Sequence, residues 1–268
     1  MFRRASMPVL IGMAACALAE PVGPQPLTPE QIRGAEFIDG ISIPNPGELF
    51  AAFGKSGKPD WAAFFRKQPP APHTSRPLIA LNLGIRLADG FLAAEAQDRQ
   101  QVKNVSMEIK LLAKSLGLEQ DYMVRSNSIA DFADSRQWDA LVEEIEAVRG
   151  ELAATMEGQR DADLVMLMSL GCWLRSVDIA TAELVANYSP ENANILRGSA
   201  IGEFFSTRLS ALPAKTRAIP VIAEIQQRLP ELSRALAFPE GKTPPKDKVS
   251  GMHRITAAMI SIIAAPEK

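Results

Sequence analysis

The sequence predicts an all-α protein, an antiparallel helical bundle with a Pro-rich N-terminal arm. Three observations support this fold class. No Pro occurs from Leu78 to Ser189, where Ala, Leu, Glu and Gln, all good helix formers, abound. No run of alternating β-branched residues indicates a strand. A hydrophobic content of 47% over 268 residues is sufficient for a substantial core.

The composition also excludes several classes of protein. The chain is too apolar and, at 22% charged residues, too weakly charged to be disordered. Two Cys cannot form a disulfide-rich scaffold. A formal net charge of −2 and a pI near 5.8 lack the basic excess of a dedicated nucleic-acid binder.

Residues 1–19 have the pattern of an export signal. Arg3 and Arg4 form a basic start, an apolar run follows from Met7 to Ala15, and Ala17-Leu18-Ala19 is a small-x-small cleavage site. The apolar run is too short to span a bilayer. We therefore expect an exported chain that is periplasmic or extracellular.

Cys16 offers an alternative for the same segment. Met13-Ala14-Ala15-Cys16 approximates a bacterial lipobox, so lipidation at Cys16 would tether the protein to a membrane as a lipoprotein. We expect membrane contact only through such an anchor.

Residues 20–77 form the predicted arm, with eleven Pro and short helices. Thr28-Pro29 and Asn45-Pro46 each combine a capping residue with Pro at the first helical position. Aromatic residues have two interpretations here, as anchors that hold the arm on the bundle or as a partner-binding surface. They are Phe37, Phe50, Phe53, Trp61, Phe64 and Phe65.

Residues 78–268 form the predicted bundle domain. The expected helices cover about residues 76–97, 98–116, 120–133, 135–157, 161–188, 190–209 and 249–265. Pro213, Pro220 and Pro230 separate two further helical pieces before the last of these. The segments 78–94 and 164–174 are apolar almost all round, which predicts that their helices are central.

Each central segment carries an Arg and an Asp three residues apart, Arg86 with Asp89 and Arg175 with Asp178. Charged groups on an apolar helix must be paired, because an unpaired buried charge is very costly. Arg175 and Asp178 therefore have two interpretations, an ion pair that fixes helix register or a polar ligand pocket in the bundle core. Arg86 and Asp89 form, with Asn82, a narrow polar stripe, which either faces solvent or a helix end or belongs to a polar network inside the bundle.

Two mid-helix glycines accompany these pairs. Gly84 and Gly171 predict close approach of helices, since each costs about 1 kcal/mol relative to Ala in an open helix. The repeated Gly and Arg-x-x-Asp patterns also allow two related helical hairpins, although the two repeats do not align in one register.

The sequence offers little for catalysis. Its only His are His73 and His253, no Cys or His pair has metal-ligand spacing, and no nucleotide or nucleophile motif occurs. After signal cleavage Cys172 is the one remaining Cys, and a buried small hydrophobe is the simplest role for it. We expect no enzymatic activity, no cofactor and no bound metal.

Two segments carry a family resemblance. Leu81-Asn-Leu-Gly-Ile-Arg-Leu-Ala-Asp-Gly90 and Leu170-Gly-Cys-Trp-Leu-Arg-Ser-Val-Asp-Ile-Ala-Thr181 resemble segments of exported, all-helical bacterial proteins, lipoproteins or secreted chains of unknown function. The resemblance covers about residues 78–188. It implies an exported all-α fold and carries no catalytic residues.

Together these features predict an exported, non-enzymatic helical-bundle protein that acts as a binding or scaffolding module in the cell envelope. The alternative is a small-ligand sensor or carrier with a polar pocket in the bundle core. The candidate ligand-binding residues are Arg175, Asp178, Arg86 and Asp89. The partner is a protein or a small ligand, and not a nucleic acid.

Overall fold

A computed structural model describes residues 36–38, 41–55, 57–67, 72–239 and 241–267. The predicted signal at 1–19, with Cys16, lies outside the described residues. So does the first predicted arm helix at Thr28-Pro29.

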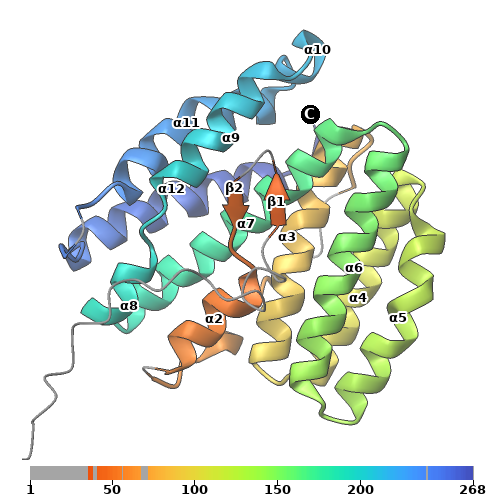
Figure 1. The fold of residues 1–268 in the computed structure, drawn as a ribbon, viewed down its shortest axis with the longest axis horizontal. Coiled ribbons are helices and arrows are strands. Elements are labelled where there is room, and N and C mark those ends of the chain that lie inside the picture. Colours follow the sequence, from red (N-terminus) through yellow and green to blue (C-terminus); the bar gives the residue numbers. More distant parts are fainter. Residues whose placement is uncertain (1–35, 39–40, 56, 68–71, 240, 268) are drawn as a thin grey trace, which may run out of the picture.

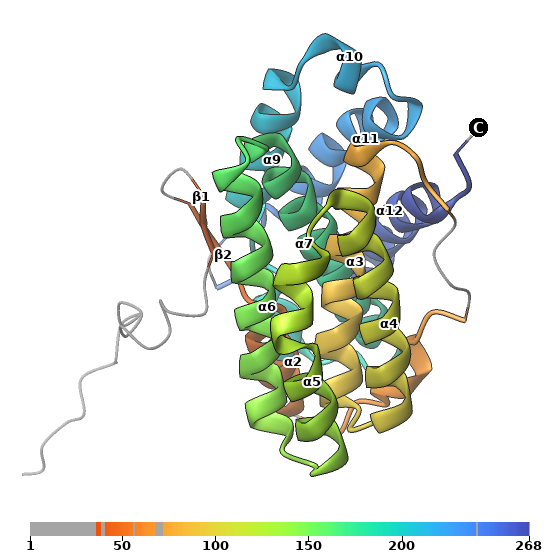
Figure 2. The ribbon, with the colours of Figure 1, turned by 90° about the vertical axis from the view of Figure 1, so that its right-hand side faces the viewer.

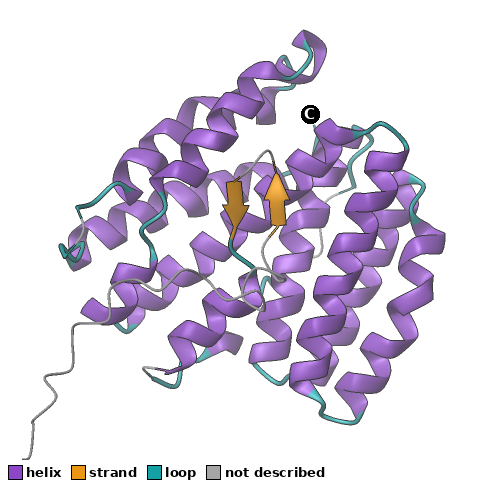
Figure 3. Cartoon of the chain, viewed as in Figure 1, coloured by secondary structure: helices purple, strands orange, loops and turns teal. Residues whose placement is uncertain are grey.

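The described chain is all-α, as predicted, with one small exception in the arm (Figures 1 and 3). Strands β1 (Glu36–Ile38) and β2 (Ile41–Ile43) pair antiparallel. The sequence predicts no strand, so this hairpin is a difference from the prediction. Three residues are too few to display an alternating pattern, although Ile and Phe favour pleated structure. After them come α2 (Pro46–Lys55) and the 3₁₀ helix η1 (Trp61–Phe64).

The predicted Pro-free region folds into five helices. They are α3 (Arg76–Glu95), α4 (Arg99–Leu116), α5 (Glu119–Asp134), α6 (Trp138–Gly158) and α7 (Ala162–Ala186). Local signals set their ends as expected. The Asp98 carboxylate accepts a hydrogen bond from the backbone N–H of Gln101 at 2.9 Å, and Gly117 ends α4 with a φ of 81°.

The C-terminal part contains α8 (Pro190–Ile195), α9 (Ser199–Ala211), α10 (Ala214–Arg217), α11 (Pro220–Leu236) and α12 (Lys246–Ala264). Two predictions were wrong here. The helix expected over 190–209 breaks into α8 and α9 before Gly198. In contrast, α11 continues through Pro230, which is exposed, because the same helix face is buried on both sides of it, at Ile225, Leu229 and Leu232.

Eight of the described helices form two groups of four that meet along α3 and α7 (Figures 1 and 2). In the first group α3 packs on α4 and α6, and α5 packs on both of those helices. In the second group α7 packs on α9 and α12, and α11 packs on both of those. Chain order thus runs around each group in the same way. This shared order is compatible with the two related units that the sequence repeats suggested, which stay a hypothesis.

The two central helices are buried along most of their length, as predicted. Every residue from Leu78 to Ala94 in α3 and from Leu164 to Thr181 in α7 is buried. By length and hydropathy alone both helices could cross a membrane. Their most apolar windows, however, are 94% and 100% buried within the protein, as expected of core helices.

Gly84 and Gly171 explain how α3 and α7 approach so closely. A Cβ on Gly84 would lie 1.9 Å from the carbonyl oxygen of Met168, and one on Gly171 would lie 2.1 Å from that of Leu81. Neither position has room for any side chain. The prediction that these glycines permit close helix contact is confirmed.

Described aromatic residues of the arm anchor it on this core. Phe50 and Phe53 are fully buried and Trp61 is almost so, while Phe64 and Phe65 are partly buried against the core. The Phe50 and Trp61 rings pack 5.4 Å apart. Of the two interpretations, anchoring holds for Phe50, Phe53 and Trp61. The side chain of Phe37 lies outside the description.

Candidate functional site

The four predicted site residues meet where α3 contacts α7, and we call Arg86, Asp89, Arg175 and Asp178 the charge cluster. Asp89 is its centre. One carboxylate oxygen of Asp89 accepts from Arg86 Nη1 at 2.8 Å, and the other accepts from Arg175 Nε at 2.7 Å. Arg175 also donates through Nη1 to Asp178 at 2.7 Å. The cluster therefore links the two central helices through ion pairs.

All four side chains are buried, with between 2% and 5% of each residue exposed. The interpretation of Arg86 and Asp89 as a stripe that faces solvent or a helix end is therefore wrong, because α3 is enclosed by other helices along this stretch. Burial lowers the pKa of Arg175, but Asp89 and Asp178 outweigh that effect and the net shift is upward. Burial likewise raises the pKa of Asp178, but His253 and Arg175 outweigh it and the net shift is downward. The mutual pairing thus keeps both groups ionised despite burial.

Several residues that the sequence reasoning missed complete the cluster. Glu108 of α4 lies 2.9 Å from Arg86 Nε. From α12, the Thr256 hydroxyl donates to Asp178 Oδ1 at 3.2 Å, and His253 Nδ1 lies 3.4 Å from the same Oδ1 atom. Arg175 Nη2 donates to the backbone oxygen of Phe64 at 2.7 Å, which ties the arm to the core. These contacts join segments far apart in the chain, and no local pattern indicates them.

Arg66, just after η1, is the third arginine near this cluster. Its pKa is lowered to about 10, mainly by burial, while the opposing effect of Asp89 and Asp178 is partly offset by Arg86 and Arg175. Its Nη1 atom is buried and has no hydrogen-bond partner among the described residues. Arg66 is therefore a cation that stands beside the cluster without sharing its ion pairs.

An open groove of about 800 Å³ borders Arg66, and we call it the α4 groove. One wall is the arm segment, through Ala62, Ala63, Phe65, Arg66 and Lys67. The other wall is one face of α4, through Gln101, Asn104, Met107, Glu108 and Leu111. Arg66 and Glu108 thus belong both to the groove and to the surroundings of the charge cluster.

Two apolar side chains on this face of α4 are unusually exposed. Met107 is 68% exposed and Leu111 is 64% exposed, while the core side of the same helix buries Val105, Ile109 and Leu112. Their spacing of four residues places them one above the other. A sequence signal for this site did exist, because Met107 and Leu111 interrupt the polar face of an amphipathic helix.

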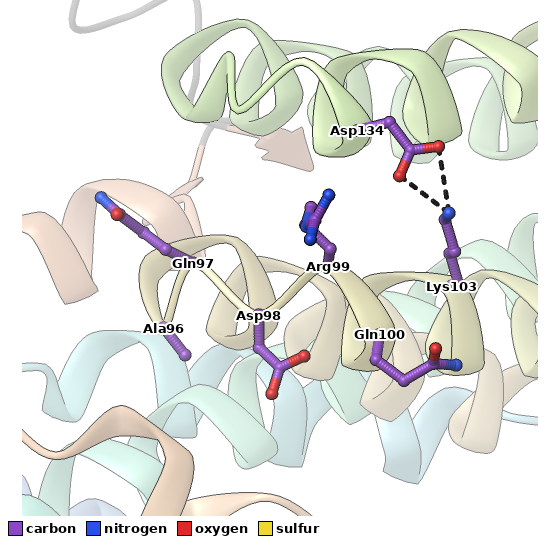
Figure 4. A pocket seen from close by; sticks show the side chains of 7 residues that line it. All are labelled: Ala96, Gln97, Asp98, Arg99, Gln100, Lys103 and Asp134. Carbon is purple, nitrogen blue, oxygen red and sulfur yellow. Dashed lines mark hydrogen bonds and ion pairs between the residues drawn. The ribbon is translucent and has the colours of Figure 1, made fainter.

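A second open pocket lies at the turn between α3 and α4 (Figure 4). It is lined by Ala96, Gln97, Asp98, Arg99, Gln100, Lys103 and Asp134. Lys103 pairs with both carboxylate oxygens of Asp134, at 2.8 and 3.0 Å, and the Asp98 carboxylate caps α4. These polar groups thus have structural partners, and the pocket offers no apolar surface comparable to that of Met107 and Leu111.

The chemistry of the charge cluster is that of a structural network. Its carboxylates and guanidinium groups bind one another, and among the described residues no group of three or more His, Cys, Asp or Glu is arranged to hold a metal ion. Cys172 is buried, as predicted, with 5% exposure. Whether the four predicted residues also bind a ligand stays a prediction, and their mutual pairing favours the ion-pair interpretation.

Comparison with known proteins adds no relative. No family model, no curated protein and no solved structure matches the chain.

Proposed function

We propose that the chain is an exported, non-enzymatic binding module of the cell envelope, and that the α4 groove is its contact surface. The observation that carries this proposal is the exposure of Met107 and Leu111 at 68% and 64% in a groove. Exposed apolar side chains that line a concavity are a common feature of binding surfaces. The signal-like segment 1–19 supports export.

The proposed contact surface lies on α4 and not at the arm aromatics. Phe50, Phe53 and Trp61 are buried in the core and cannot meet a partner. The arm still contributes, because Phe65, Arg66 and Lys67 form one wall of the groove. Arg175 fixes this wall through its hydrogen bond to the Phe64 oxygen. In this proposal the charge cluster positions the binding surface.

Native mass spectrometry of the protein purified from its own cells tests the proposal. Three forms are compared, the unchanged chain, the double variant Met107→Gln/Leu111→Gln, and the control Val124→Gln. Val124 is 75% exposed on α5 and does not line the groove. The Val124→Gln control therefore removes an exposed apolar side chain without changing the groove.

We expect the unchanged chain and the Val124→Gln control to retain a bound mass that the double variant loses. An identical set of masses for all three forms would show that the groove is not the contact surface. The same spectra report processing, since cleavage after Ala19 and lipidation at Cys16 give different protein masses.

A further inference from the structure

We infer that the α4 groove binds a small amphiphilic carboxylate, with its carboxylate group at Arg66 and its aliphatic chain against Met107 and Leu111. This inference rests on the proposed function and names the chemical class of its ligand. We commit to a free monocarboxylate, such as a medium-chain fatty acid.

The first step is that Arg66 is the one arginine near the charge cluster that forms no ion pair with a described residue. Asp89 is shared by Arg86 and Arg175, Asp178 is bound by Arg175, and Glu108 lies 2.9 Å from Arg86. No carboxylate pairs with Arg66 in the described part of the chain, and its Nη1 has no hydrogen-bond partner there. Arg66 also lines the groove, so an anion bound there would gain a charge-assisted contact with a guanidinium group that the described protein does not pair.

The second step is the charge of the groove walls. Arg66 and Lys67 are the basic residues among those that line it, and Glu108 is the acidic one. Arg86 already engages Glu108, and burial raises the pKa of this carboxyl group. The groove therefore has a positive end, with a charge that suits one carboxylate.

The third step is the apolar surface next to that charge. Met107 and Leu111 are exposed on α4, and Phe65 is half-buried on the opposite wall. From Asn104 to Leu111 the helix rises about 10 Å, at 1.5 Å per residue. An extended alkyl chain fits such a strip, and its burial provides the hydrophobic part of the binding energy. The volume of about 800 Å³ falls within the usual range for small-molecule sites.

Isothermal titration with decanoate tests the inference, with decanol as the uncharged ligand of equal chain length. Five proteins are compared: the unchanged chain, Arg66→Gln, Arg66→Lys, Met107→Gln/Leu111→Gln, and the control Lys110→Gln. Lys110 lies on α4 but does not line the groove. Far-ultraviolet circular dichroism confirms that each variant is folded, and Arg66→Lys serves as a second, charge-retaining variant.

We expect decanoate to bind the unchanged chain and Lys110→Gln equally well. Arg66→Gln should weaken the binding of decanoate about tenfold or more, which is the contribution of one charge-assisted hydrogen bond. The affinity for decanol should not change. Arg66→Lys should restore part of the loss, and the double variant should weaken both ligands.

Two results would overturn the inference. One is the absence of decanoate binding, and the other is equal decanoate affinity in the unchanged chain and Arg66→Gln. Either result leaves the proposed function standing if native mass spectra still show that Met107→Gln/Leu111→Gln loses the bound mass that the unchanged chain retains. If the double variant also keeps that mass, the groove is not a binding surface.

Discussion

Asp89 is the residue on which the contact between the two central helices most depends. Its two oxygens accept hydrogen bonds from Arg86 and Arg175, all three residues being at most 5% exposed. Removing the charge of Asp89 would leave two buried guanidinium groups short of a partner. The cost of such a loss exceeds the net value of the pair, because the remaining charges stay desolvated.

We therefore predict that Asp89→Asn lowers the free energy of unfolding by about 3–5 kcal/mol, measured by urea denaturation. Asp134→Asn is the matched control. It removes an Asp that pairs with Lys103 but is half exposed, so it should change stability by less than about 1 kcal/mol. Equal effects of the two substitutions would contradict a structural role for the charge cluster.

Glu183 of α7 should make stability depend on pH. The residue is 4% exposed, its Oε2 atom has no hydrogen-bond partner within the described residues, and Asn187 donates to Oε1 at 3.1 Å. Burial, helped by Asp60, raises the pKa of this carboxyl group. A raised folded-state pKa means that the folded protein holds the proton more tightly than the unfolded chain. Ionisation of Glu183 therefore reduces stability as pH rises above the ordinary Glu pKa.

Glu183→Gln should accordingly be more stable than the unchanged chain at pH 7, and the difference should shrink below about pH 4.3, the ordinary Glu pKa. Thermal unfolding of both proteins across this pH range measures the effect. A difference that does not vary with pH, or that grows as pH falls, would show that the Glu183 carboxylate is not destabilising.

Residue types alone predicted part of the site. An ion pair was one of the two interpretations of Arg175 and Asp178, and the structure pairs them. For Arg86 and Asp89 a solvent-facing stripe was considered as well, but the structure buries and pairs them. The hydrogen bond between Arg175 and Asp89 could not be predicted from the sequence, because it depends on how α3 and α7 cross. Arg66 was missed for the same reason, since nothing in a Pro-rich segment indicates which helix it will meet.

At the scale of the elements, two glycines set the distance between α3 and α7. Gly84→Ala or Gly171→Ala would force a methyl group into a backbone carbonyl oxygen of the facing helix. Backbone cannot yield as a flexible side chain can, so the helices must separate.

We predict that each of these substitutions destabilises the protein by about 3 kcal/mol, at the upper end for overpacking. Gly150→Ala is the control. It lies inside α6 with nothing within 4 Å of the added Cβ, and it should stabilise the protein by about 0.5–1 kcal/mol through helix propensity. Chemical denaturation of the three variants gives the comparison, and tolerance of Ala at Gly84 and Gly171 would mean that the helices are not in close contact.

The elements show where sequence patterns suffice and where packing overrides them. The helix predicted over residues 98–116 matches α4 to within one residue at each end. Pro230 was expected to end a helix but lies inside α11, because Ile225, Leu229 and Leu232 bury one continuous face. A proline on the exposed side costs less than the loss of that face.

For the whole molecule, the two groups of four helices share one continuous hydrophobic core through α3 and α7. They should therefore unfold together. The three Trp are well placed to test this, since Trp61 is in η1, Trp138 begins α6 in the first group and Trp173 is in α7 in the second.

In protein labelled with 5-fluorotryptophan, all three ¹⁹F resonances should lose their native intensity at the same urea concentration, as in a two-state transition. An earlier loss for Trp138 than for Trp173 would show that the two groups unfold separately.

The claim that matters most for function is that ligands bind at the α4 groove and not within the charge cluster. Backbone amide chemical shifts of the labelled protein, recorded during a decanoate titration, test it most directly. We predict saturable shifts confined to residues 61–67 and 101–111 and their immediate neighbours. Shifts centred on α7 and α12 around Asp178 and His253, with α4 unchanged, would contradict the claim. They would indicate that decanoate binds in the bundle core.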